Sequence, residues 1–119
     1  MEDLTFECDW VQILNITKDS TVLFRTDSSF VIGSGHVMRC LTLADELRES
    51  CGEIGFICRE LPGNLIEYIE RRGFRVFRLA LRENAPWRAD AEGTGEIILR
   101  NRLNPDWLVV DHYALDKQW

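Results

Sequence analysis

The residues best suited to chemistry in this 119-residue chain form a Gly-Ser-Gly-His turn at positions 33–36. The turn lies between a predicted strand and a predicted helix. Backbone N–H groups at a helix start lack acceptors within the helix, and the helix dipole adds partial positive charge, so this junction attracts phosphate or carboxylate. The glycines let the backbone approach a ligand closely, and His36 beside it can accept a proton. The turn indicates catalysis on a phosphorylated small molecule. The alternative is a tight turn in which His36 is only a helix cap.

Two other polar groups follow predicted strands. Arg25 and Asp27 come at the end of the first strand, where they are either substrate contacts or a salt bridge at the rim of the sheet. Asp111-His112-Tyr113 ends the last predicted strand. There Asp111 can orient a neighbouring group and Tyr113 can hydrogen-bond a ligand. A strand that merely emerges into solvent would carry the same kinds of residue.

Two residues on the predicted helix after the turn have alternative interpretations. Arg39 either lines the cleft or is an ordinary solvated helix residue. Cys40 is four residues from His36 and shares its helix face, which is a spacing that zinc sites use. It also falls among the apolar residues of that helix, which predicts a buried thiol instead. The four cysteines form no C-x-x-C pair, so no metal site is predicted.

Hydrophobic patterns predict alternating strands and helices. The strands cover 21–26, 54–58, 74–79 and 107–112; the helices cover 36–50, a stretch from 62–64 to a stop at Gly73, and 96–103; residues 81–94 are predicted as a loop. This alternation favours an α/β fold, with a Rossmann-like parallel sheet and helices on both faces. The most apolar strand segments, 22–24 and 108–110, are expected at the centre of the sheet. Ligands bind beyond the carboxyl ends of such strands, so the polar groups there should face one cleft.

Composition narrows the class of protein. The formal charge of −6 argues against a nucleic-acid binder, which normally has a basic face. No apolar run approaches the roughly 18 residues that span a bilayer, and the first residues do not resemble a secretory signal. We therefore expect a cytoplasmic protein without membrane or nucleic-acid partners. Residues 1–20 are an unassigned extension, residues 21–119 are one Rossmann-like domain, and the residues after Tyr113 look like a helix cut short.

Four separated segments together resemble one known family. They are Phe24–Asp27, Ile32–Cys40, Leu43–Leu47 and Val109–Asp116. The family is the UDP-2,4-diacetamido-2,4,6-trideoxy-β-L-altropyranose hydrolases of pseudaminic acid biosynthesis, with relatives among spore-coat polysaccharide biosynthesis proteins. The resemblance covers about residues 21–119 in colinear order.

The resemblance implies the N-terminal half of a GT-B-like architecture and the hydrolysis of a UDP-sugar to UDP and free sugar. His36 matches the family's essential histidine and would activate water for inverting attack, and Tyr113 would position substrate or water. The implied substrate contacts are Arg25, Asp27, Gly33, Ser34, Gly35 and Asp111. No metal or cofactor is implied. The family's second, nucleotide-binding domain is not in this sequence, so we expect weak or no activity from the chain alone.

Two other functions remain open. One is a GT-B-type glycosyltransferase, because G-x-G-H turns occur there too. The other is a non-catalytic module that binds a sugar phosphate.

Overall fold

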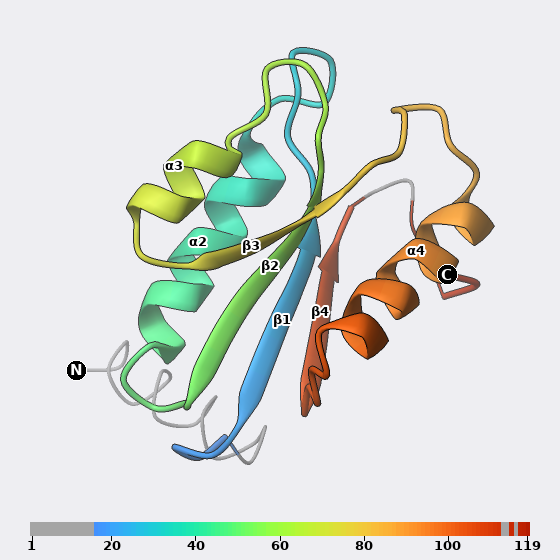
Figure 1. The fold of residues 1–119 in the computed structure, drawn as a ribbon. Helices are drawn as coiled ribbons and strands as arrows, with labels where there is room; N and C mark the ends of the chain where they lie inside the picture. The colour runs from blue at the N-terminus through green and yellow to red at the C-terminus, as the bar shows by residue number, and fades with distance from the viewer. Residues whose placement is uncertain (1–15, 113–114, 116) are drawn as a thin grey trace.

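The computed structural model describes residues 16–112, 115 and 117–119, in which strands and helices alternate along the chain (Figure 1). The elements are β1 (Thr21–Thr26), α2 (Gly35–Leu47), β2 (Glu53–Arg59), α3 (Ile66–Arg71), β3 (Arg75–Leu79), α4 (Trp87–Arg100) and β4 (Trp107–Asp111). The strands form one sheet in the order β3-β2-β1-β4, and every neighbouring pair is parallel. The predicted α/β fold with a Rossmann-like parallel sheet is confirmed.

Helices cover both faces of this sheet, which explains the apolar run in β1. Helices α2 and α3 lie on one face and α4 lies on the other (Figure 1). Phe24 belongs to the core under α2 and α3, whereas Leu23 belongs to the core under α4, and both side chains are fully buried. Successive residues of a strand point to opposite faces, so a strand covered on both sides needs apolar residues throughout.

Strand register brings the polar strand ends together. In β1, Thr26 pairs with Asp111 of β4, and Arg25 pairs with Ile57 of β2. The hydroxyl of Thr26 also donates a hydrogen bond of 3.1 Å to the carbonyl oxygen of Asp111. The polar groups that follow β1 and β4 therefore share the carboxyl edge of the sheet, as predicted.

The position of β4 differs from the prediction. Strand β1 is central, but β4 lies at an edge of the sheet formed by the described residues, and its side chains from Leu108 to Asp111 are only half-buried. An apolar run therefore did not distinguish a central strand from an edge strand.

The start of helix α4 is a second correction. The predicted loop over 81–94 is wrong from Trp87 onward, and the helix ends at Arg100 rather than at residue 103. Gly93 and Gly95 weaken the helical pattern, because glycine is a poor helix former. Gly93 nevertheless has a packing role, since a Cβ built there would be 2.7 Å from Cδ1 of Leu79 on β3. None of the helices in the described residues is long and apolar enough to cross a membrane.

The two glycines of α4 provide a matched stability test. A Cβ on Gly95 meets nothing within 4 Å, so Gly95→Ala should raise the free energy of unfolding by about 0.5–1 kcal/mol through helix propensity. Gly93→Ala should gain less or destabilise, because the Leu79 methyl must move. Urea unfolding of the two variants measures the difference. Equal stabilisation by both would contradict the close packing of α4 on β3.

Candidate functional site

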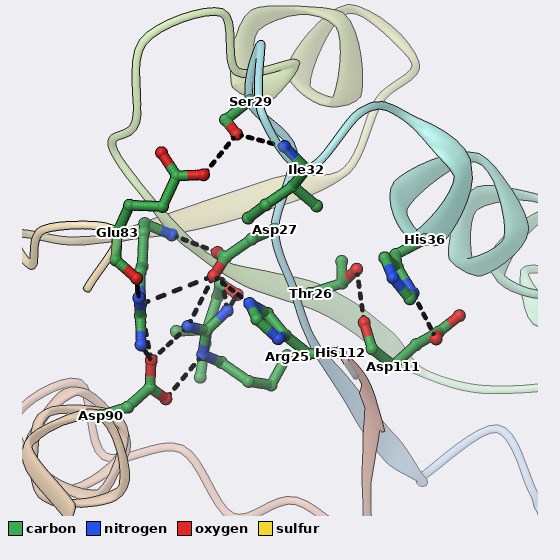
Figure 2. A network of polar contacts seen from close by, with 12 residues as sticks. Arg25, Thr26, Asp27, Ser29, Ile32, His36, Glu83, Asp90, Asp111 and His112 are labelled. Carbon is green, nitrogen blue, oxygen red and sulfur yellow. Dashed lines mark hydrogen bonds and ion pairs between the residues drawn. The ribbon is translucent and has the colours of Figure 1, made fainter. Parts of the chain in front are cut away.

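The candidate site is built around an imidazole and a carboxylate at the carboxyl edge of the sheet. His36 is the second residue of α2, and Asp111 is the last residue of β4. The His36 Nδ1 atom lies 2.8 Å from Asp111 Oδ1 (Figure 2). Both side chains are partly accessible, at 17% and 22% exposure, so solvent or a ligand can reach the pair.

The partner of His36 decides which ring nitrogen carries the proton. An ionised carboxylate only accepts hydrogen bonds, so the contact with Asp111 requires a proton on Nδ1. In the neutral ring Nε2 is then the basic nitrogen. We assign this tautomer from the hydrogen-bond network. A histidine oriented in this way by a carboxylate is suited to accept a proton from water or a hydroxyl group.

Arg39 binds the same carboxylate. Its Nε and Nη2 atoms donate hydrogen bonds of 2.8 Å each to Oδ2 and Oδ1 of Asp111. Hydrogen bonds from Arg39 lower the pKa of Asp111 and outweigh the opposite effect of burial, and His36 contributes in the same direction. Asp111 therefore stays ionised over the range in which an imidazole titrates. Arg39 was expected either to line the cleft or to be a solvated helix residue. Its side chain is 67% exposed to solvent and also binds Asp111, so both descriptions apply.

The Gly-Ser-Gly turn places the start of α2 beside this pair. Gly33 has a φ of +85°, a conformation that favours glycine, and Ser34 precedes the helix without a side-chain capping bond in the described structure. Gly33 donates its backbone N–H to the carbonyl of Ser29 (2.8 Å), so that donor serves the turn itself. The first turn of α2, from Gly35, presents N–H groups without acceptors in the helix. Gly33, Ser34 and Gly35 are all exposed.

A buried serine fixes the loop that leads into this turn. The Ser29 hydroxyl accepts hydrogen bonds from the backbone N–H groups of Val31 (3.1 Å) and Ile32 (2.8 Å), and it donates one to Glu83 Oε2 (3.1 Å) (Figure 2). Glu83 belongs to the loop between β3 and α4. Ser29 therefore links the segment before the glycine turn to the loop between β3 and α4.

Next to the partly exposed pair of His36 and Asp111 lies a buried cluster of charges. The Arg25 guanidinium donates to both carboxylate oxygens of Asp27 (2.8 and 3.0 Å) and to both of Asp90. Arg59 donates to Asp90 through Nε (2.8 Å) and to Asp27 through its backbone N–H (2.8 Å). The four side chains are at most 2% exposed. Their charges offset one another, which buried ions require.

The cluster determines the ionisation of its members. Burial alone would raise the pKa of Asp27, but hydrogen bonds from His112 and Arg25 outweigh it and hold that pKa well below its usual range. The pKa of Asp90 is lowered in the same way, against burial, chiefly by Arg25. The same carboxylates raise the pKa of Arg25 despite its burial. All three groups are therefore charged at neutral pH.

His112 connects the buried cluster to the exposed pair. Its Nε2 atom lies 3.1 Å from Asp27 Oδ2, and its side chain is 4% exposed. Its ring stacks on that of His36, with centroids 6.2 Å apart and an angle of 10° between the planes. The buried cluster thus supports one face of the candidate base (Figure 2).

The predicted site residues therefore divide into three groups. His36, Asp111 and the glycine turn lie together at an accessible edge. Arg25 and Asp27 are fully buried and form the salt bridge that the sequence left as an alternative to substrate contact. Tyr113 lies outside the described residues.

Two members of the buried cluster were missed. Asp90 falls in the region predicted as a loop, and Arg59 ends β2. An acidic residue shortly after Pro86, in the first turn of a helix, was an available signal for Asp90.

Cys40 is buried at 3% exposure, as predicted, and burial with the nearby charge of Asp111 raises the pKa of its thiol to about 11. No group of three His, Cys, Asp or Glu side chains among the described residues could hold a metal ion.

The buried cluster makes folding sensitive to acid. Because the pKa values of Asp27 and Asp90 are lower in the folded chain, their stabilisation is complete above the unfolded pKa near 4 and is lost as the pH falls below it. The free energy of unfolding, measured with urea from pH 7 to 3, should therefore stay nearly constant down to a pH of about 4 and decrease at lower pH.

Two variants locate the source of this effect. Asp90→Asn should cost about 3–5 kcal/mol at neutral pH, because it leaves buried arginine charge uncompensated. Asp19→Asn, at an exposed turn position, should leave the pH profile unchanged. Full stability and an unchanged acid dependence in Asp90→Asn would contradict the role of the cluster.

Comparison with known proteins gives two distant relatives. No family model matches the chain. It is 34% identical over 95 residues to the UDP-2,4-diacetamido-2,4,6-trideoxy-β-L-altropyranose hydrolase of Campylobacter jejuni, a match that covers 79% of this chain and 28% of that protein. It is 30% identical over 97 residues to an uncharacterized protein of Methanocaldococcus jannaschii, covering 79% of this chain and 17% of that protein. The chain thus spans less than a third of either relative and is distantly related to a protein named as a UDP-sugar hydrolase.

Proposed function

We propose that this chain is the N-terminal domain of a nucleotide-sugar hydrolase, which releases UDP from a 2,4-diacetamido-2,4,6-trideoxy hexose. The observation that carries the proposal is the 2.8 Å contact between His36 and Asp111, placed beside an anion-attracting helix start. The distant Campylobacter jejuni relative, named for this reaction on a UDP-sugar, supports the choice of substrate.

In the proposed reaction His36 acts as a general base. Its Nε2 takes a proton from a water molecule while the water oxygen attacks the anomeric carbon. The bond from that carbon to the β-phosphate oxygen breaks, its electron pair leaves with UDP, and the configuration inverts. Asp111, hydrogen-bonded through Nδ1, stabilises the imidazolium that forms. The charge balances because UDP departs as an anion and the proton stays on His36.

The glycine turn would hold the phosphate end of the substrate. Exposed N–H groups at the start of α2 fit a sugar phosphate, and Gly33 to Gly35 have no side chain beyond the Ser34 hydroxymethyl group to block its approach. Tyr113 remains a proposed partner that positions substrate or water. For Arg25 and Asp27 we propose a supporting role, because their complete burial leaves them no surface to offer a ligand.

The rest of the active site would come from a second domain. The resemblance to the hydrolase family implies a GT-B-like arrangement, in which another domain binds most of the nucleotide. The pathway would be the biosynthesis of pseudaminic acid or a related surface polysaccharide. Because the cleft needs both halves, the chain alone is expected to turn over slowly at best.

The test replaces the His36 imidazole in a two-domain context. In a chimera, this chain takes the place of the segment that it matches in the Campylobacter jejuni hydrolase, and UDP release from the UDP-linked diacetamido sugar is measured. His36→Ala should lower kcat by about 10²–10⁴-fold, the usual contribution of a general base. Glu46→Ala, an exposed change on the same helix, is the control and should leave the rate unchanged.

Two results would contradict the proposal. UDP release that survives His36→Ala would remove His36 as the base. With an acceptor sugar added to the assay, a glycoside product in place of free sugar would favour the glycosyltransferase, since the same base could deprotonate a hydroxyl group of the acceptor instead of water.

A further inference from the structure

Arg39 makes a two-pronged contact with the Asp111 carboxylate, although most of its side chain is exposed to solvent. It lies three residues after His36 on α2, so the two side chains share one side of the helix. The guanidinium meets the Asp111 carboxylate with two hydrogen bonds of 2.8 Å, one to each oxygen. Such a paired contact fixes the plane of the carboxylate as well as its position.

The carboxylate that Arg39 holds is the one that orients the base. Asp111 Oδ1 accepts from both Arg39 Nη2 and His36 Nδ1, each at 2.8 Å. Arg39 Nη2 is also 3.1 Å from His36 Nδ1. Because both of these nitrogens carry hydrogen when Asp111 is ionised, their approach is a shared contact with one oxygen and not a hydrogen bond between them. Three groups therefore meet at Oδ1.

Asp111 needs such a restraint because of where it lies. It is the final residue of β4, an edge strand among the described residues, and its side chain is partly exposed. The neighbouring Cys40 thiol is a weak donor at 4.0 Å from Oδ2. Apart from the hydrogen bond from His36 itself, Arg39 thus supplies the directional contacts of a partly exposed aspartate at a strand end.

We propose that Arg39 is a positioning residue, which clamps the Asp111 carboxylate and thereby keeps His36 in the form protonated on Nδ1 and basic on Nε2. This inference rests on the proposed function only for its catalytic consequence. The structural claim concerns the tautomer of His36 and can be tested without any activity.

The test is ¹⁵N NMR of the histidine rings in the 119-residue chain, recorded with the rings in their neutral form. In the wild-type chain the Nδ1–H form of His36 should dominate. Arg39→Gln should lower the ratio of the Nδ1–H to the Nε2–H form by roughly tenfold, the effect of losing one charge-assisted contact. Arg39→Lys should restore the ratio only in part, because an ammonium group supplies charge without the two-pronged fork.

The variants at position 39 should fold normally, so a change in the tautomer ratio does not reflect unfolding. Arg39 is largely exposed, so its replacement should leave the amide spectrum of the sheet intact. Arg100→Gln, an exposed arginine on α4, is the matched control and should leave the tautomer ratio unchanged. An unchanged ratio in Arg39→Gln, or full restoration by lysine, overturns the proposed clamp.

The two-domain chimera then reports on catalysis. Arg39→Gln should lower kcat for UDP release with little change in KM, because the base loses its orientation while substrate contacts remain. If the tautomer shifts but the wild-type chimera releases no UDP, the clamp stands and the proposed hydrolase function fails.

Discussion

Buried charges at the carboxyl edge of the sheet neutralise one another, and this pairing fixes how the strands, the loop after β1 and α4 meet. Arg25 is the penultimate residue of β1 and Arg59 is the last residue of β2. Asp27 comes from the loop after β1, and Asp90 from the first turn of α4. None of these ions is stable in the interior without its partners. The requirement therefore ties α4, the two strands and the loop to one geometry.

His112 connects the buried cluster to His36 and Asp111 at the edge of the sheet. The histidine contacts Asp27 on the inner side and stacks on the His36 ring on the outer side. The β1–β4 register, in which Thr26 faces Asp111, brings the carboxylate to the same point. A buried cluster of paired charges thus supports His36 and Asp111, whose own contacts are only partly buried. Such a division lets side chains at the edge change without loss of the fold, whereas changes to the buried cluster should destabilise it.

Much of the site followed from local sequence patterns. The apolar run of β1, the glycine turn and the helical period after it predicted where His36 would lie, and parallel topology predicted that the polar groups after β1 and β4 would face one cleft. The contact between His36 and Asp111 itself was not predicted. These features depend on periodicity and on the rule that parallel strands end at one edge. The partner of each charge was harder to predict, because it depends on contacts between distant segments. Asp90 lies 65 residues from Arg25, and the glycines of α4 concealed the helix that carries it.

The edge position of β4 shows a second limit of sequence patterns. Its run from Leu108 to Val110 resembles that of a buried central strand, but strand order is decided by crossovers and not by composition. The role of Arg39 was undecided for a related reason. Helical spacing placed it on the side of His36, yet only the β1–β4 register brings Asp111 within its reach.

Binding at this edge of the sheet can be tested by an NMR titration of the ¹⁵N-labelled chain with the UDP-linked diacetamido-trideoxy hexose at millimolar concentration. We expect the shifts to concentrate in the backbone amides of residues 33–37 and in the ring of His36, even where binding by this domain is weak. The absence of shifts there, or shifts gathered at the opposite edge of the sheet, around Arg48 at the end of α2 and Gly73 before β3, would contradict the assignment of the carboxyl edge as the substrate site.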